Sequence, residues 1–138
     1  MSAPLYNAEI LRLAAAIPHH ERLADPMGSS EKRSPVCGSR VTVDVDLDEA
    51  GRVRAIGLLV RACALGQASS SLLAAAALGR SRQELAAARD ELAAWLAGGE
   101  AAPGWPGLSV FEPARPHTAR HASIRLAFEA AAEAAERA

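Results

Sequence analysis

The sequence predicts an α+β domain, with a small antiparallel three-stranded sheet packed on one face by four to five helices. Segments 41–47 and 53–62 carry strand-like patterns and are joined by a short turn, which indicates a hairpin. Helix-like segments precede and follow this hairpin, so strands and helices are grouped rather than alternating. The 138 residues, 50% of them apolar, suffice for one hydrophobic core. We expect a single domain over residues 1–138.

The first segment predicts an amphipathic helix over 8–17, because apolar residues recur at helical spacing from Ile10 to Ile17. Pro18 ends that pattern. The following residues, 18–36, contain three prolines, a glycine and several serines, a composition typical of loops. We therefore expect a long connection before the first strand of the hairpin.

Apolar and polar residues alternate across 41–48, which predicts a strand with one buried face and one solvated acidic face. The apolar set is Val41, Val43, Val45 and Leu47, and the polar set is Thr42, Asp44, Asp46 and Asp48. Residues 48–51 form the turn, and 53–62 follow as a second, more buried strand. Carboxylates spaced along a strand lie too far apart for one tight cation site, so we interpret them as a solubilising face.

Three further helices are predicted after the hairpin. The first spans 64–78 and ends at Gly79, a residue type favoured at helix C-termini. The sequence Ser81-Arg82-Gln83-Glu84 forms a capping box and starts the second, which stops at a pair of glycines. Residues 100–116 are rich in proline and glycine and are expected to form a loop, and the last helix is expected over 117–138. Its predicted core-facing residues are Ile124, Leu126, Ala127 and Phe128.

Charge balance and hydropathy exclude two classes of function. The formal net charge is −1 at pH 7, which gives no electrostatic case for nucleic-acid binding. No apolar run reaches the length of a membrane span. Residues 1–6 lack the basic and apolar regions of a secretory signal, so we expect a cytoplasmic protein whose thiols stay reduced. A disulfide between its two cysteines, Cys37 and Cys63, is accordingly not expected.

Those two cysteines carry the strongest functional signal. Cys37 lies just before the first hairpin strand, and Cys63 lies just after the second, at the start of a helix. A thiol at a helix N-terminus is near the positive end of the helix dipole and ionises more easily. Thiolates bind soft metals and accept sulfur, so the pair indicates metal or sulfur chemistry. The alternative interpretation is two small buried apolar side chains.

Several motifs resemble those of one known family. They are Cys37-Gly38 before the hairpin, Cys63-Ala64 after it, the Ala68-Ser69-Ser70-Ser71 run, the Leu5-Tyr6 and Ile10-Leu11 pairs, Asp25-Pro26 with Gly28, and the segment from Arg120 to Phe128. This combination resembles the scaffold proteins of iron–sulfur cluster assembly, the family of IscU, SufU and the NifU N-terminal domain. The resemblance covers nearly the whole chain, and the motif around Cys63 is its most specific part.

The resemblance implies a fold and a ligand set, and the chain departs from that set at two positions. The family binds zinc or a cluster with three cysteines and an aspartate. Here Ser39 stands at the aspartate position. Ser123 stands at the third cysteine position in a gap-free alignment, and Ala122 stands there if His121 is aligned with the histidine that precedes this cysteine in IscU. A neutral serine hydroxyl is a poor ligand for zinc or iron.

Two histidines offer replacement ligands. His117 and His121 are four residues apart, a spacing that places both imidazoles on one face of a helix. In the fold that the resemblance implies, this helix start lies near both cysteine loops. The candidate zinc ligands are a set of two thiolates and two imidazoles: Cys37, Cys63, His121 and His117. The alternative interpretation of His117 is a solvated helix terminus.

The function we expect is that of a scaffold-like protein in iron–sulfur cluster assembly, and not that of an enzyme. It would bind a metal, either zinc or an iron–sulfur cluster, at Cys37, Cys63 and His121, or relay sulfur through the cysteines, with Cys63 the better acceptor. The resemblance implies a cysteine desulfurase and apo-protein acceptors as partners. The alternative is a non-metal interaction or regulatory module that kept the scaffold fold and lost the cluster chemistry. The sequence leaves the oligomeric state open.

Overall fold

A computed structural model describes residues 5–35 and 38–138 of the chain. Within these ranges the chain forms three strands, four α-helices and two 3-10 segments. In chain order they are α1 (Ala8–Ala15), β1 (Gly28–Arg33), β2 (Arg40–Leu47), β3 (Val53–Arg61), α2 (Ala64–Ala76), α3 (Arg82–Leu96), η1 (Leu108–Ala114), η2 (Thr118–Arg120) and α4 (His121–Arg137). The predicted α+β class is confirmed. No helix in the described part of the chain is both long and apolar enough to cross a bilayer.

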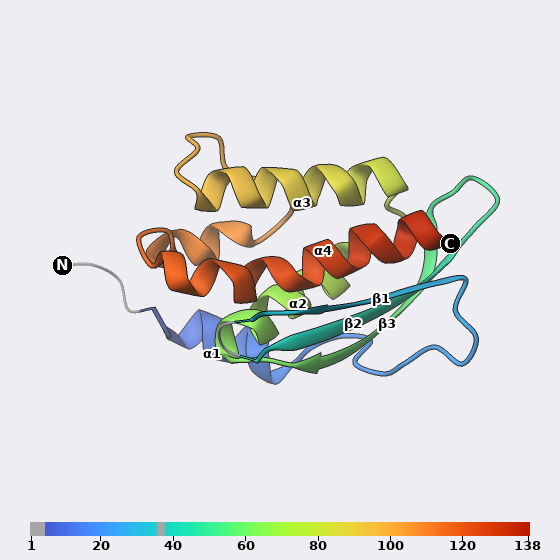
Figure 1. Cartoon of the computed structure of the whole chain (residues 1–138), viewed down its shortest axis with the longest axis horizontal. Coiled ribbons are helices and arrows are strands. Elements are labelled where there is room, and N and C mark those ends of the chain that lie inside the picture. The colour runs from blue at the N-terminus through green and yellow to red at the C-terminus, as the bar shows by residue number, and fades with distance from the viewer. Residues whose placement is uncertain (1–4, 36–37) are drawn as a thin grey trace.

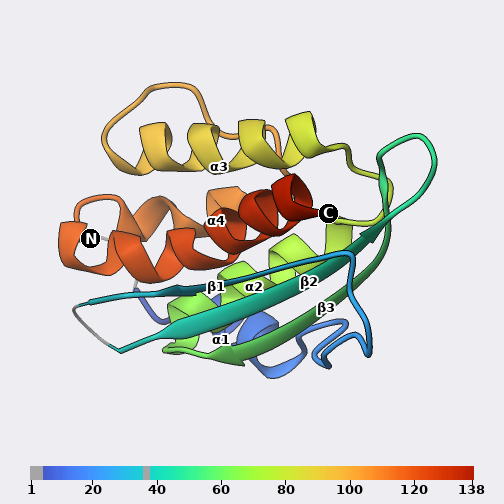
Figure 2. The same cartoon turned by 45° about the vertical axis from the view of Figure 1, so that its right-hand side comes forward.

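The sheet and the helices form three layers (Figure 1). The strands follow the order β1-β2-β3 and are antiparallel throughout. Helix α4 packs against β1 and β2, while α2 packs against β3 and also contacts α1. Figure 2 shows α3 on the side of α4 that faces away from the sheet. The core lies between the sheet and the helices, and its fully buried side chains include Val41, Val43, Leu58, Leu73, Ile124 and Phe128.

The structure of β1 differs from the prediction made from the sequence. A loop is predicted over 18–36, but Gly28–Arg33 forms β1. Its glycine, serines and charged residues have little intrinsic preference for strands, so pairing with β2 and packing against α4 decide its structure. Arg137 of α4 donates a hydrogen bond to the carbonyl of Ser29 at 3.0 Å. A strand without apolar residues gives no periodic signal, which is why the sequence did not reveal it.

The outer face of the sheet corrects a second prediction. Asp44 is not solvated, because its side chain is fully buried. Arg22 Nε and Nη2 donate to its carboxylate at 2.7 and 3.0 Å. Ser29 Oγ donates at 2.6 Å and the Leu23 N–H at 3.1 Å. Burial alone would raise the pKa of Asp44, but these hydrogen bonds outweigh it and hold the pKa below its ordinary value.

The connection between α1 and β1 lies across this face and explains the burial. Asp46 accepts a hydrogen bond from the Met27 N–H at 2.9 Å. Gly57 of β3 lies directly beneath the connection, where a Cβ atom would collide with the carbonyl oxygen of Glu21. Asp44 and Asp46, which the sequence predicts as part of a solubilising face, are therefore docking points for the connection. Asp48 instead accepts hydrogen bonds from the N–H groups of Ala50 and Arg52 in the β2–β3 turn.

The same connection also protects the free edge of β3. The Leu58 N–H donates to the carbonyl of His19 at 2.9 Å, and the Val60 N–H donates to Nε2 of His20 at 3.3 Å. Outward N–H groups on an edge strand invite pairing with another chain. Here these two are already occupied by the chain's own loop.

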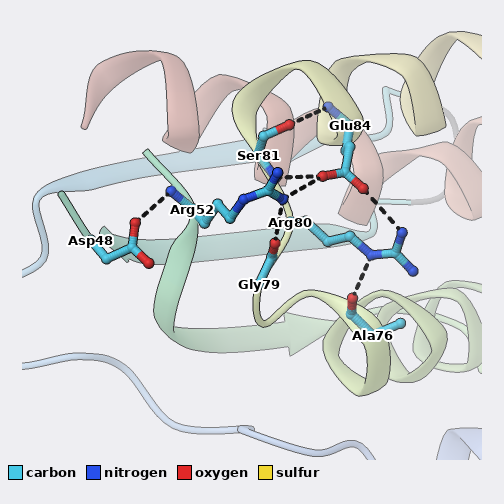
Figure 3. A network of polar contacts seen from close by, with 7 residues as sticks. All are labelled: Asp48, Arg52, Ala76, Gly79, Arg80, Ser81 and Glu84. Atoms are coloured by element: carbon cyan, nitrogen blue, oxygen red, sulfur yellow. Dashed lines mark hydrogen bonds and ion pairs between the residues drawn. The ribbon is translucent and has the colours of Figure 1, made fainter. Parts of the chain in front are cut away.

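A polar network joins the β2–β3 turn to the start of α3 (Figure 3). Arg52 Nη1 donates to the carbonyl of Gly79 and to the carboxylate of Glu84, both at 2.9 Å. Ser81 and Glu84 form the predicted capping box, with Ser81 Oγ accepting from the Glu84 N–H at 3.1 Å. Arg80 adds an ion pair with Glu84 at 3.3 Å. These contacts hold the β2–β3 turn against the helical layers.

The Asp44 interactions predict a pH-dependent stability. We expect Asp44→Asn to lower the free energy of unfolding at pH 7 by about 2 kcal/mol, because the ionised pair with Arg22 is lost. The folded pKa of Asp44 lies below the unfolded value of roughly 3.9, so this stability is present above that pH and is lost as the pH falls through the folded pKa. Urea unfolding of both proteins should show a difference in the free energy of unfolding that becomes smaller below about pH 4.

The matched control is Asp90→Asn, at an exposed ion pair with Arg89. This variant should leave the free energy of unfolding nearly unchanged at every pH. If the difference in the free energy of unfolding between wild type and Asp44→Asn keeps its full size in acid, the assignment of a depressed pKa to Asp44 is contradicted.

Candidate functional site

Ser39 and Cys63 lie at the same end of the sheet, as the strand pairing dictates. Arg40 opens β2 and lies opposite Arg61, the last residue of β3. Ser39 directly precedes Arg40, and Cys63 follows Arg61 by two positions. Both therefore lie beyond the same end of two adjacent strands. The fold brings the start of α2 next to the β1–β2 turn.

Cys63 is the N-cap residue of α2, which confirms its predicted position at a helix start. Its carbonyl accepts the first hydrogen bond of the helix, from the Gln67 N–H at 2.9 Å. Its side chain makes no capping hydrogen bond, and the thiol is free and partly exposed. The first turn of α2 contains no acidic residue. The thiol therefore lies at the positive end of the helix with no carboxylate in that turn.

Cys37 lies outside the described residues, so its predicted role stays a prediction. The turn between β1 and β2 is closed by two backbone hydrogen bonds on either side of this position. The Ser34 N–H donates to the carbonyl of Ser39 at 2.8 Å, and the Gly38 N–H donates to the carbonyl of Ser34 at 3.2 Å. Gly38 has a φ of +71°, in the left-handed region that favours glycine.

The starts of α4 and α2 lie in direct contact. A Cβ atom on Gly66 would lie 3.2 Å from the carbonyl oxygen of Ser123. Ser69 Oγ donates to the carbonyl of Ile124 at 2.6 Å. Gly66 is one turn after Cys63, so Ser123 lies near the same helix end. Three segments thus converge here: the β1–β2 turn, the start of α2 and the start of α4.

His121 is the first residue of α4 and is 9% exposed. Its Nε2 lies 2.9 Å from the carbonyl oxygen of Arg115 and 3.2 Å from that of Ala114. Carbonyl oxygens only accept, so Nε2 carries a proton and donates to them. In a neutral ring this leaves the lone pair on Nδ1, an arrangement that metal-binding histidines share. The same bonds hold the end of η1 against α4.

The predicted histidine pair does not share a helix face. Helix α4 begins at His121, and the preceding residues Thr118–Arg120 form η2. His117 lies before η2 and is exposed, and its N–H donates to the carbonyl of Ala114 at 2.9 Å in a 3-10-like turn. The prediction that both imidazoles lie on one helix face is therefore wrong, because α4 begins at His121. Metal binding by His117 and by His121 stays a prediction.

No three His, Cys, Asp or Glu side chains within residues 5–35 and 38–138 lie together as a metal-binding group. Cys63, His117 and His121 therefore do not form a site by themselves. A ligand set that includes Cys37 stays a prediction.

Comparison with solved structures identifies the family. The N-terminal part of a nitrogen-fixing NifU-like protein from Brucella abortus is 38% identical to this chain, with a TM-score of 0.91 over 96% of this chain and 93% of that one. The chain belongs to the iron–sulfur cluster assembly scaffold family. A putative scaffold protein of the SUF system from Fervidobacterium islandicum shares the fold, with a TM-score of 0.84 at 17% identity over 95% of this chain and 96% of that one.

Sequence comparison agrees with this assignment. The iron–sulfur cluster assembly scaffold protein IscU of Streptococcus pyogenes is 29% identical over 83 residues, or 60% of this chain. The match spans about half the length of that protein, 52%. No protein-family model matches the sequence. The family resemblance inferred from the motifs is confirmed.

The resemblance places Ser39 at the family's aspartate position, and Ser123 or Ala122 at that of its third cysteine. Ser39 and Ser123 are 4% and 3% exposed. Ser39 and Ser123 both take part in interactions within the protein. Neutral hydroxyls are poor ligands for iron or zinc beside thiolate or imidazole. Within residues 5–35 and 38–138, Cys63 belongs to no group of three or more His, Cys, Asp or Glu side chains that could hold a metal ion.

Three arginines that flank this site were missed by the sequence analysis. Arg33, Arg40 and Arg61 lie directly opposite one another across the three strands. Their side chains share one face, because directly opposed residues point to the same side of a sheet. The hydrogen bond from Arg33 holds the pKa of Glu31 below its usual value. The sequence of any one strand does not indicate this row, because the three arginines are brought side by side by the pairing between the strands.

The His121 contacts predict a structural contribution. His121→Ala should lower the free energy of unfolding by about 2–3 kcal/mol, because it removes a nearly buried ring and its hydrogen bonds to two carbonyls. His117→Ala, at an exposed position, is the matched control and should leave stability nearly unchanged. Urea unfolding with and without a zinc chelator measures both effects. A chelator that brings the wild type down to the stability of His121→Ala would instead identify His121 as a zinc ligand.

Proposed function

We propose that this protein serves iron–sulfur cluster assembly by accepting sulfur on Cys63, as a scaffold-like cytoplasmic protein rather than an enzyme. The observation that carries the proposal is a free, partly exposed thiol at the start of α2, in a scaffold-family fold. A single thiol is sufficient to accept a sulfur atom, whereas holding a cluster requires a full donor set. With serine at two of the family's ligand positions, sulfur acceptance is the chemistry that the remaining residues support.

The proposed step is an exchange between a thiol and a persulfide, with a cysteine desulfurase as donor. The Cys63 thiolate attacks the terminal sulfur of a persulfide on the desulfurase. A new S–S bond forms at Cys63, the S–S bond on the desulfurase breaks, and the desulfurase cysteine leaves as a thiolate. The step needs no external oxidant or reductant. Apo-proteins are the proposed final acceptors of the assembled product.

Sulfur labelling tests the step. We expect incubation with a cysteine desulfurase and 35S-cysteine to label the wild type and Cys37→Ser, and not Cys63→Ser. Mass spectrometry under non-reducing conditions should locate a gain of one sulfur atom on the peptide that contains Cys63. Cys37→Ser is the matched control, since it removes the other thiol of the chain. Labelling that is lost in Cys37→Ser and kept in Cys63→Ser would overturn the assignment.

The alternative function is a non-metal interaction or regulatory module. Ser39 and Ser123 favour it, because both are buried, take part in interactions within the protein, and carry neutral hydroxyls where the resemblance implies charged ligands. Such a module would keep a partner surface and hold neither sulfur nor metal. Zinc binding by Cys37, Cys63 and His121 is a further possibility that measurement of zinc per purified chain tests.

Restoring the missing ligands tests the interpretation of the donor set. We expect the double variant Ser39→Asp/Ser123→Cys to gain the visible absorption of a cluster when it is reconstituted anaerobically with iron and sulfide. The wild type should stay near the background. The matched control is Ser39→Asp/Ser71→Cys, which places the added thiol two turns along α2 from Cys63. Equal absorption in wild type and double variant would show that the donor set is complete as it stands.

A further inference from the structure

The outer face of the sheet is covered over only part of its length. The connection between α1 and β1 contacts it through the Arg22–Asp44 pair and over Gly57. Two rows of residues lie beyond these two contacts, toward the end that carries Cys63. The connection reaches the edge of β3 there through His20, whose Nε2 accepts from the Val60 N–H at 3.3 Å. In strand order the rows are Glu31, Thr42 and Leu59, and then Arg33, Arg40 and Arg61. We call the second of these the arginine row.

The arginine row is open to solvent. The side chains of Arg33 and Arg40 are 66% and 34% exposed, and Arg61 is also exposed. A cavity of about 350 Å³ lies beside the row, and its remaining lining is Ser34, Pro35 and Gly38. Leu59 lies two residues before Arg61 on the same face and is 37% exposed. An apolar side chain and three guanidinium groups therefore share one surface.

The charges of the arginine row are only partly balanced. Glu31 pairs with Arg33 at 3.0 Å and lies 3.8 Å from Arg40. Arg61 has no ion pair with any residue of the described ranges. Like charges directly opposite one another destabilise a sheet. The chain as a whole has a net charge of −1, so this excess of positive charge is a local feature rather than a consequence of composition.

We propose that the arginine row and Leu59 form the docking surface for an acidic segment of the protein that delivers sulfur to Cys63. Guanidinium groups bind carboxylates through paired hydrogen bonds and suit this role better than any other side chain. Arg61 lies two residues before Cys63, so a segment bound there holds its protein beside the thiol. Complementary charge also speeds the encounter with the correct partner. This inference rests on the proposed function.

A peptide titration tests the surface directly. The probe is the peptide Glu-Glu-Leu-Glu-Glu, added to the 15N-labelled full chain and followed by two-dimensional 15N–1H NMR. We expect shifts concentrated at the ends of the three strands near the arginine row. Raising NaCl from about 50 mM to about 300 mM should weaken binding, because screening shortens the reach of exposed charges. The peptide Lys-Lys-Leu-Lys-Lys should produce no such shifts.

Charge-matched variants provide the control. Arg33→Gln/Arg40→Gln/Arg61→Gln should weaken binding of the acidic peptide by about tenfold, while its thermal unfolding temperature stays equal or rises because opposed like charges are gone. Arg12→Gln/Arg54→Gln/Arg89→Gln removes the same number of charges elsewhere and should bind like the wild type. Equal weakening in both triple variants would overturn the proposal. So would tighter binding of a single-stranded oligonucleotide, or displacement of the peptide by millimolar inorganic phosphate.

Sulfur transfer separates this inference from the proposed function. If the arginine row docks the donor, the variant without the row should accept labelled sulfur from the desulfurase about tenfold more slowly, and high salt should slow the wild type similarly. Wild-type transfer rates in that variant would overturn the docking surface and leave Cys63 as the acceptor. Peptide binding without any sulfur transfer to Cys63 would instead overturn the proposed function.

Discussion

The buried carboxylate of Asp44 is the constraint on which much of the structure depends. It lies in the middle of the central strand and binds Arg22, Ser29 and the Leu23 N–H, which belong to the loop and to the neighbouring strand. A buried charge without a partner is strongly unfavourable, so the loop must close over the sheet for the strand to be stable there. Closure also occupies the edge of β3. It covers part of the outer face and leaves Leu59 and the arginine row, near Cys63, at least partly exposed.

The two ends of the sheet consequently differ in the side chains that they carry. The end with the β2–β3 turn is held by the network around Arg52 and Glu84, in which the donors and acceptors bind one another. The opposite end gathers the start of α2, the start of α4 and the β1–β2 turn, and it carries a free thiol and an exposed row of like charges. Stabilising contacts, such as those of His121 and Ser69, also lie at this end, so the free thiol is placed on a rigid part of the protein, as is typical of functional sites.

The serines at the family's ligand positions change the balance between folding and chemistry. A thiolate or carboxylate at Ser39 or Ser123 would be costly to bury without a metal, whereas a hydroxyl is easily satisfied inside the protein. The fold of the scaffold family is kept because it depends on packing contacts such as Gly66 against Ser123 and Ser69 against Ile124. Those contacts involve backbone carbonyls, a glycine and a serine hydroxyl, so the fold at this point does not depend on metal ligands.

Features that depend on neighbours in the chain could be predicted from the sequence alone: the hairpin strands, the capping box at Ser81, and Cys63 at the start of a helix. Such features follow from periodicity and from caps, which act over a few residues. The burial of Asp44, the strand β1 and the arginine row became visible with the fold, because each depends on pairing partners distant in sequence. In a sheet, the register between strands places side chains together in a way that no single segment records. His117 lies outside α4 for a local reason, since its N–H donates to the carbonyl of Ala114 in a 3-10-like turn.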